Sequence, residues 1–346
     1  MKNAIVVDSP NSALAIAART RVQFQKAQIL YSSSYSSPKK LCIELIEGDF
    51  DNVFFGWRQA LYEIAKSPGA SSCLSLLRGR SSLGVLVPDY IGVAESHFMK
   101  ESELIDYADY YLVTNQELLE IYSTGGYPKK PSGLLHDIPN LELLEATYRL
   151  NLSKNDRKAI WVGNSKWGRR QGFLDHKGFF RVVKPLNDLL RKHNSCFDLQ
   201  IIDSSKLLVS QEEILRSMSG SSYILQTSTS EGTGLPLLEG MALGLTPIST
   251  SVGVVPEILV GSLNQNIVDR SPESFHDALH SNLDSPRATR EDIRELFRSY
   301  ASEAMKEVIF SEHKAFQSET PEVTRFGSAK SRLEWQYRFW KDQSKV

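Results

Sequence analysis

The stretch from Tyr223 to Gly244 most constrains the fold, because it predicts a buried strand, a glycine turn and a helix in that order. Residues 223–226 form a short, mainly apolar run that is typical of a strand covered on both faces of a parallel sheet. Residues 235–243 carry apolar side chains at helical spacing, and Gly244 can end that helix in a left-handed conformation. This order is the building unit of a doubly wound α/β domain.

The turn between this strand and helix is suited to an anion. Gly232 and Gly234 let the backbone turn sharply and approach a ligand without a Cβ in the way. The first N–H groups of a helix have no acceptor within it. They lie at the positive end of the helix dipole and point towards whatever binds there. We expect the amides of Gly234, Leu235 and Leu237 to face a phosphate, because Pro236 at the first turn has no N–H.

Two carboxylates flank the same turn. Glu231 precedes the helix, at the strand end where ligands of open α/β sheets collect, and Glu239 follows eight positions later. Since a carboxylate accepts two hydrogen bonds from a vicinal diol, we assign Glu239 to a ribose and Glu231 to the hydroxyls of a second ring. From these residues alone, a helix-capping Glu231 and a solvated Glu239 explain the pattern equally well.

Strand and helix signals alternate along the whole chain, which favours parallel sheets covered on both faces. In the first half we expect strands at 4–7, 52–55, 84–87 and 110–113, and helices at 13–26, 59–66, 101–107 and 116–122. In the second half we expect strands at 159–162, 199–202, 223–226, 247–250 and 266–268. The polar run 151–158 separates the halves, so the chain is predicted to form two doubly wound α/β domains.

Composition excludes several classes of protein. The chain has 346 residues, of which 41% are hydrophobic and 23% charged, which is enough for two ordinary domains and shows no disordered signature. Its net charge of -1 argues against a nucleic-acid binder. The cysteines Cys42, Cys73 and Cys196 are odd in number and far apart, so neither a disulfide framework nor a metal site is expected. Without an apolar run near 20 residues or a leader-like start, a cytoplasmic protein is predicted.

The segment from Ser228 to Glu257 resembles the donor-site signature of the retaining nucleotide-sugar glycosyltransferases of group 1, which are family 4-like. That signature contains Glu-Gly-Phe-Gly-Leu-Pro, a second glutamate eight positions after the first, Pro-Val-Ile and then Gly-Gly-x-x-Glu. The chain departs from it at Thr233, Gly240 and Val254, and no departure removes a carboxylate. The resemblance implies the GT-B fold, in which two Rossmann-like domains face each other across a cleft.

The resemblance also implies three parts of the chain. Residues 1–153 would form the acceptor-side domain, residues 154–320 the donor-binding domain, and residues 321–346 a C-terminal helix that crosses back to the first domain. The aromatic and basic residues of that tail admit a second interpretation, an amphipathic helix resting on an anionic membrane at its inner face.

A second segment is similar to the family's Gly-Arg and Lys-Gly pair, whose two cations clamp the diphosphate. Lys177 matches the lysine, whereas Asn164 stands after Gly163 where the family has arginine. The chain offers three substitutes for that cation: Lys166, Arg169 and Arg170. Positioned cations stabilise the charge that builds on a departing diphosphate. A basic loop that is merely solvated is the alternative.

In the first half, polar residues at strand ends are assigned to the acceptor side. Ser9, Asn11 and Ser12 follow the first strand, although capping of the next helix explains them as well. Asp89 and Tyr90 follow another strand, where relatives carry a histidine that contacts the transferred sugar. Asp89 would hold a sugar hydroxyl or help with the acceptor proton, and a Pro-Asp turn is the alternative.

The resemblance thus implies a retaining, hexosyltransferase-like enzyme that moves a sugar from a nucleoside-diphosphate sugar to a hydroxyl of a glycan or lipid-linked acceptor. Polysaccharide or glycolipid assembly is the expected setting, and no cofactor is expected. The catalytic set would be Glu231, Lys177 and Asp89. The donor-binding set would be Gly163, Asn164, Lys166, Arg169, Arg170, Ser230, Gly232, Thr233, Gly234, Leu235, Leu237 and Glu239. A GT-B sugar-nucleotide epimerase and a non-catalytic sugar-nucleotide binding module remain alternatives.

Overall fold

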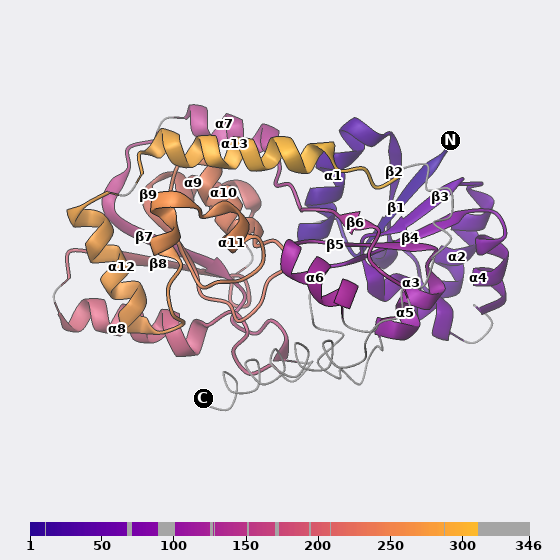
Figure 1. Ribbon diagram of the computed structural model, residues 1–346, viewed down its shortest axis with the longest axis horizontal. Coiled ribbons are helices and arrows are strands. Elements are labelled where there is room, and N and C mark those ends of the chain that lie inside the picture. Colours follow the sequence, from indigo (N-terminus) through magenta and orange to yellow (C-terminus); the bar gives the residue numbers. More distant parts are fainter. Residues whose placement is uncertain are drawn as a thin grey trace. The chain divides into compact units, whose positions relative to one another are not determined.

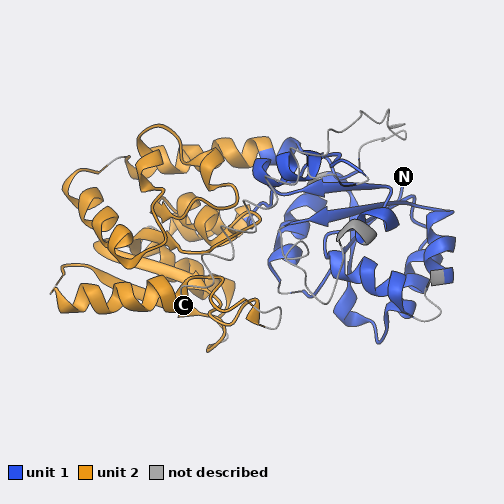
Figure 2. Cartoon of the chain, turned by 60° about the horizontal axis from the view of Figure 1, so that its bottom comes forward, with its two compact units in different colours: residues 1–140, 304–336 blue, residues 141–303, 337–346 orange. Residues whose placement is uncertain are grey.

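The computed structural model describes residues 1–10, 12–67, 71–88, 101–124, 127, 129–150, 152–169, 173–193, 195–207, 209–286 and 288–310. These residues form two compact units (Figure 2). Unit 1 contains Met1–Asn140 and residues 304–310, and unit 2 contains Leu141–Glu303. The chain therefore passes into unit 2 between residues 140 and 141. The sequence analysis placed this boundary between residues 153 and 154. The helix expected over 321–346 lies outside the described residues.

Unit 1 is built on a six-stranded parallel sheet in the order β2-β1-β3-β4-β5-β6 (Figure 1). Its strands are β1 (Asn3–Val7), β2 (Ala27–Tyr31), β3 (Asn52–Phe55), β4 (Ser82–Val87), β5 (Tyr110–Val113) and β6 (Gly133–Leu134). Its helices are α1 (Ala13–Gln25), the 3-10 turn η1 (Ser32–Ser34), α2 (Pro38–Glu47), α3 (Arg58–Lys66), α4 (Ser71–Arg78), α5 (Glu101–Tyr107) and α6 (Gln116–Thr124).

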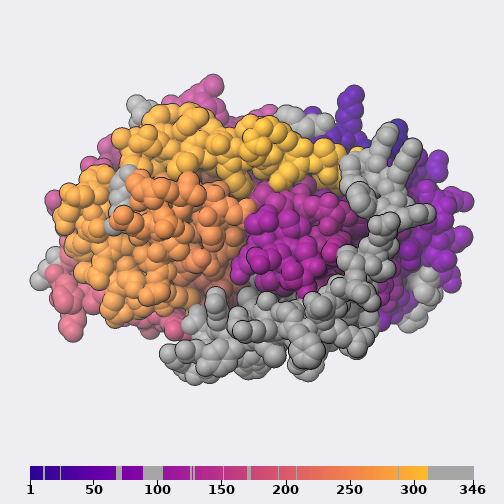
Figure 3. Space-filling model, in the orientation of Figure 1, coloured from indigo at the N-terminus to yellow at the C-terminus, as the bar shows by residue number. Residues whose placement is uncertain are grey.

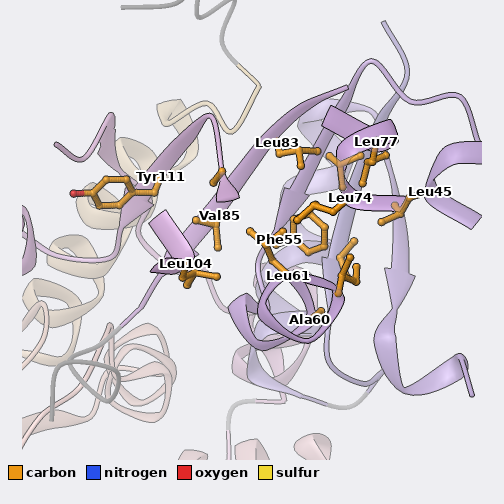
Figure 4. Packing of buried hydrophobic residues seen from close by; sticks show 14 of the residues in the cluster. Leu45, Phe55, Ala60, Leu61, Leu74, Leu77, Leu83, Val85, Leu104 and Tyr111 are labelled. Atoms are coloured by element: carbon orange, nitrogen blue, oxygen red, sulfur yellow. The ribbon is translucent and has the colours of Figure 1, made fainter. Parts of the chain in front are cut away.

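Successive side chains of the unit 1 strands point to opposite faces of the sheet. On β1, Ala4 and Val6 join a core cluster with α2 to α6, whereas Ile5 and Val7 join a second cluster with α1. Figure 4 shows part of the first cluster, in which Phe55 of β3 lies among leucines of α3 and α4. Because both faces are covered, these strands carry continuous apolar runs rather than an alternating pattern.

Unit 2 is built on a four-stranded parallel sheet in the order β10-β9-β7-β8. Its strands are β7 (Asn155–Gly163), β8 (Asp198–Asp203), β9 (Ser221–Gln226) and β10 (Thr246–Ser249). Its helices are α7 (Leu141–Arg149), the π-helical turn η3 (Phe179–Val183), α8 (Lys184–Lys192), α9 (Gln211–Ser219), α10 (Leu235–Ala242), α11 (Val255–Ile258), the 3-10 turn η4 (Gly261–Asn266), α12 (Pro272–Asp284) and α13 (Arg290–Lys306). The doubly wound α/β architecture predicted from the sequence is confirmed.

Helix α13 shows why these helices form. Its inner residues Ile293 and Phe297 are buried in the core of unit 2. Its outer residues include Arg298, which pairs with Glu291 at 2.6 Å and with Glu295 at 3.1 Å. Figure 3 shows this helix at the surface, in yellow. None of the helices in the described ranges combines the length and apolar character needed to span a bilayer.

The last residues of α13 and those that follow it complete unit 1. Tyr110 Oη donates to the carbonyl oxygen of Ile309 at 3.0 Å, and Ile309 itself is buried. The carboxylate of Glu307 accepts the backbone N–H of His136 at 2.7 Å and lies 3.4 Å from the guanidinium of Arg21, whose side chain is 4% exposed. Residues 304–310, the return segment, therefore supply the carboxylate that pairs with the buried Arg21 of unit 1.

Two expectations about elements were wrong. Residues 266–268 do not form a strand, because Ile267 makes only an isolated bridge to Ser249 after the 3-10 turn η4. Residues 155–158, expected in a polar separator, belong to β7, where Lys158 pairs with Asp198 of β8. Elements β2 and α2 were not predicted from the sequence.

Candidate functional site

The candidate site lies where the strand order of unit 2 reverses. β7 is central, with β8 on one side and β9 on the other, so the chain leaves β7 and β9 towards different faces of the sheet. In open α/β sheets, ligands bind at the carboxyl ends of the strands at such a switch point. The loops that follow β7 and β9 carry the predicted donor-site residues.

These two loops bring Lys177 and Glu231 together. Lys177 Nζ lies 2.5 Å from Glu231 Oε1, and their side chains are 21% and 14% exposed. Ser228 Oγ donates to the same carboxylate oxygen at 2.5 Å. The two residues assigned to catalysis from separate motifs thus form one partly shielded ion pair. The alternative that Glu231 serves only as a helix cap does not account for this pairing.

Lys177 is held through its backbone. Thr227 Oγ1 donates to the Lys177 carbonyl oxygen at 2.6 Å and itself accepts from Trp161 Nε1 at 3.1 Å. The next residue, Gly178, has φ +73°, and a Cβ at this position would overlap the Thr227 carbonyl oxygen. Only glycine fits that close approach without strain. The position of the Lys177 backbone relative to β9 is therefore fixed.

A buried polar network supports the same loop. The Asp175 carboxylate accepts the backbone N–H groups of Phe180 at 3.1 Å and Arg181 at 2.8 Å, so it caps the start of η3. Arg270 donates to the carbonyl oxygens of Asp175 and Thr227 and so ties the two loops together. The sequence analysis missed Arg270, which lies outside both motifs, and no sequence signal marks it.

His176 and Trp167 form an aromatic layer next to Lys177. Their ring centroids are 4.3 Å apart, and Lys177 Nζ lies 5.3 Å from the Trp167 ring centre. Burial lowers the pKa of His176 well below its usual range, and the charges of Lys177 and Arg270 act in the same direction. His176 is therefore neutral and adds no charge of its own to the site.

The other cations of the β7 loop are arranged differently. Asn164 Oδ1 accepts the backbone N–H of Lys166 at 2.9 Å, so Asn164 shapes the turn that follows Gly163. Lys166 is exposed, and the exposed Arg169 places its guanidinium 5.0 Å from the Phe180 ring centre. Arg170 lies outside the described residues. Of the proposed diphosphate cations, Lys177 is the one seen bonded to Glu231 in the described part of the loop.

The glycine turn after β9 has the predicted form. Gly234 caps α10 with φ +87°, and a Cβ there would overlap the side-chain amide of Gln226. The amide of Leu237 donates to the Gly234 carbonyl oxygen at 3.0 Å and is used within the turn. The amides of Gly234 and Leu235 lie at the helix start, where helix geometry leaves them without intrahelical acceptors. Ser230 and Thr233 are buried in the same loop, which also contains Gly232.

Glu239 is buried on α10, not solvated. It is 7% exposed, and Gln211 Nε2 of α9 donates to its Oε1 at 2.8 Å. Burial raises the pKa of Glu239 to about 7, and the Gln211 hydrogen bond opposes that rise. The carboxyl therefore titrates in the neutral range. The sequence analysis missed Gln211, which precedes the signature.

The acceptor-side residues of unit 1 are seen only in part. Ser12 caps α1, because its Oγ accepts the backbone N–H of Ala15 at 3.1 Å, and it donates to Asp8. The Ser9 carbonyl oxygen accepts the backbone N–H of Ser12 at 3.2 Å. These contacts favour the capping interpretation. The predicted residues Asn11, Asp89 and Tyr90 lie outside the described residues.

The described residues contain no group of three or more His, Cys, Asp or Glu side chains placed to hold a metal ion. No disulfide joins Cys42, Cys73 and Cys196 in the described part of the chain.

Comparisons with known proteins agree with this geometry. Residues 187–300 match the family described as glycosyl transferases of group 1. No curated protein matches the chain by sequence. Sucrose-phosphate synthase from Thermosynechococcus elongatus has a similar structure, with a TM-score of 0.59 at 14% identity over 88% of this chain and 97% of the other.

HepE of Anabaena, in complex with UDP and glucose, also has a TM-score of 0.59, at 12% identity over 88% of this chain and 95% of the other. The pneumococcal O-GlcNAc transferase GtfA, in complex with UDP and GlcNAc, has a TM-score of 0.53 at 13% identity, over 77% of this chain and 57% of the other. The protein therefore has the GT-B fold, and its residues 187–300 match the family of group 1 glycosyl transferases.

Proposed function

We propose that this protein is a retaining glycosyltransferase that moves a hexose from a nucleoside-diphosphate sugar to a hydroxyl acceptor. The observation that carries the proposal is the Lys177–Glu231 ion pair, at the strand reversal of the unit whose residues 187–300 match the group 1 family. A cation, a carboxylate and a helix start near one another are what a sugar diphosphate requires.

In this proposal, the diphosphate lies on the amides of Gly234 and Leu235. Lys177 leaves Glu231 and pairs with the diphosphate, so the charge that grows on the leaving group is stabilised as the bond breaks. Glu239 accepts the hydrogen bonds of the ribose diol. Glu231, freed from Lys177, holds hydroxyls of the transferred sugar and stabilises positive charge at its ring.

The reaction needs no protein nucleophile. The bond between the anomeric carbon and the diphosphate oxygen breaks, and the acceptor oxygen attacks the same face of the sugar. The proton of the acceptor hydroxyl passes to the departing phosphate oxygen. This route keeps the anomeric configuration and balances all atoms without a cofactor.

UDP-hexose is the donor to test first, because HepE and the pneumococcal GtfA are both described in complex with UDP. A glycan or lipid-linked hydroxyl in polysaccharide or glycolipid assembly is the proposed acceptor, with the protein in the cytoplasm or at the inner face of the membrane.

The test incubates the full chain with UDP-glucose or UDP-GlcNAc and a panel of saccharide and lipid-linked acceptors. UDP release that requires an acceptor, with an α-linked product by proton NMR, is the expected result. A β-linked product contradicts retention. A change of sugar configuration without acceptor indicates an epimerase, and UDP binding without turnover on any acceptor indicates a binding module. Lys184→Ala, at an exposed position of α8, is the matched control for Lys177→Ala.

A further inference from the structure

Gln211 is the first residue of α9, and its side-chain amide donates a hydrogen bond to Glu239 of the donor site. Its Nε2 lies 2.8 Å from Glu239 Oε1. The start of α9 is fixed by a capping box, in which Glu213 N donates to Ser210 Oγ at 3.3 Å and Ser210 N donates to Glu213 Oε2 at 3.0 Å. The Gln211 backbone is therefore anchored independently of Glu239.

The carboxyl of Glu239 has an unusual setting for an acid. Among the residues that the structure describes, its one hydrogen-bond donor is Gln211, and no cation is paired with it. The charged and titratable groups on the elements packed against α10 include Glu212, Glu213 and Arg216 on α9, Tyr223 on β9, and Lys154, Arg290 and Arg294 next to the C-terminal end of α10. None of these is bonded to the Glu239 carboxyl in the described part of the chain.

We propose that Gln211 is a positioning residue for donor capture, which favours the ionised form of Glu239 and turns its second carboxylate oxygen towards the ribose diol. The inference rests on the proposed function, since it deepens the role of Glu239 in that site. It assigns a residue outside the family signature to the recognition of the nucleotide.

The chemistry follows from the donor and acceptor counts of the groups. A carboxylate offers acceptors to both the Gln211 amide and the two diol hydroxyls, whereas a protonated carboxyl turns one oxygen into a donor. An N–H donor to the carboxylate stabilises the charged form. Removing it raises the pKa of Glu239 further, so the fraction ready for the diol falls at neutral pH. The affinity for the sugar nucleotide then weakens about tenfold for each pH unit below that pKa.

The test is calorimetric titration of the full chain with UDP from pH 5.5 to 9. Gln211→Met keeps the side-chain length and removes the hydrogen-bond donor, the Nε2 amide group. We expect its affinity to fall about tenfold at pH 7, to approach wild type at pH 9, and KM for the donor to rise with kcat unchanged. Gln211→Asn shortens the amide and is expected to restore part of the binding at neutral pH. Glu212→Ala, at the exposed neighbouring position, is the matched control.

A loss of affinity in Gln211→Met that is equal at every pH would overturn the inference, because it indicates a purely structural role. A ligand-free readout separates this result from a failure of the proposed function. The pH dependence of the unfolding difference between each protein and its Glu239→Gln partner reports the pKa of Glu239. We expect its midpoint to move upward in Gln211→Met, and an unmoved midpoint rejects the inference whether or not UDP binds. If the midpoint moves upward in Gln211→Met but the wild-type chain binds no UDP, only the proposed function is rejected.

Discussion

Lys177 Nζ and Glu231 Oε1 lie 2.5 Å apart, although 54 positions separate them in the chain. The two side chains form an ion pair, and each is less than a quarter exposed. In the proposed reaction, the diphosphate of the sugar nucleotide would bring the negative charge that releases Glu231 from this pair. The arrival of the donor can therefore be coupled to the presentation of a free carboxylate to its sugar.

Replacing Lys177 with alanine should lower kcat/KM for transfer by about 10²–10³, because the leaving diphosphate loses its positioned cation. Lys184→Ala should leave transfer unchanged, since Lys184 is exposed at the start of α8. Steady-state release of UDP in the presence of acceptor measures both. Equal activity of Lys177→Ala and wild type would contradict the role of this lysine.

Replacing Glu231 with alanine should separate nucleotide binding from transfer. The substitution frees Lys177 from its carboxylate partner, so we expect UDP to bind as tightly as in wild type or up to about tenfold more tightly. Transfer should fall by at least about a hundredfold, because the sugar loses the group that orients it. Calorimetry with UDP and the transfer assay measure the two quantities. Weaker UDP binding would show that Glu231 contacts the nucleotide itself.

Replacing Glu239 with glutamine should make the protein more stable at alkaline pH while abolishing tight donor binding. The folded pKa of about 7 exceeds the ordinary value of 4.5, so the stability linked to this carboxyl is full below pH 4.5 and is lost as the pH rises through 7. The loss amounts to roughly 3 kcal/mol. Urea unfolding at pH 4.5 and pH 8 should show the variant gaining by about that difference relative to wild type. Glu212→Gln is the exposed control, and an equal difference at both pH values would refute the assignment.

Replacing Gly178 with alanine should destabilise unit 2 by at least about 2 kcal/mol, because alanine is strained at φ +73° and its Cβ overlaps the Thr227 carbonyl oxygen. Two other glycines calibrate the effect. Gly261 has φ +59° with open space around it, so alanine there should cost about 1 kcal/mol. Gly220 has φ -83° and no close neighbour, so alanine there should be nearly neutral. Chemical unfolding ranks the three, and a different order would reject the steric account.

Replacing Glu307 with alanine should cost about 3 kcal/mol, because it leaves the buried Arg21 without its carboxylate. Glu295→Ala is the control, since the Glu295 side chain is 71% exposed and its pair with Arg298 should contribute less than about 1 kcal/mol. Thermal unfolding of both variants measures the contrast. Similar losses in the two would mean that the Glu307 carboxylate is not needed to stabilise Arg21.

Much of the fold could be predicted because turn residues bound its apolar runs. β3 and β5 begin and end where the sequence placed them. β2 could not be separated from α1, because only Lys26, with φ +43°, lies between them and no glycine or proline marks the break. The start of α2 does carry a sequence signal, because Ser37, at the end of a serine-rich run, is its N-cap. Ser37 Oγ accepts the backbone N–H of Lys40.

The site could be predicted only where one motif holds its parts. Gly234 and Glu239 follow from local sequence, because a helix start and its dipole are local properties. The contact of Lys177 with Glu231, and those of Gln211 and Arg270, depend on which strands are neighbours in the sheet. Sequence spacing carries no information on such pairing.

The described part of unit 1 comes from two stretches of chain, 1–140 and 304–310, that flank residues 141–303 of unit 2. During synthesis, its sheet can form early, but Arg21 and His136 wait for Glu307 until more than 160 further residues have left the ribosome. Until then, Arg21 of unit 1 lacks the Glu307 carboxylate and keeps the His136 carbonyl oxygen as an acceptor. Cutting the bond after residue 140 would likewise leave the return segment tethered to the other unit, so limited proteolysis there would not release a finished domain.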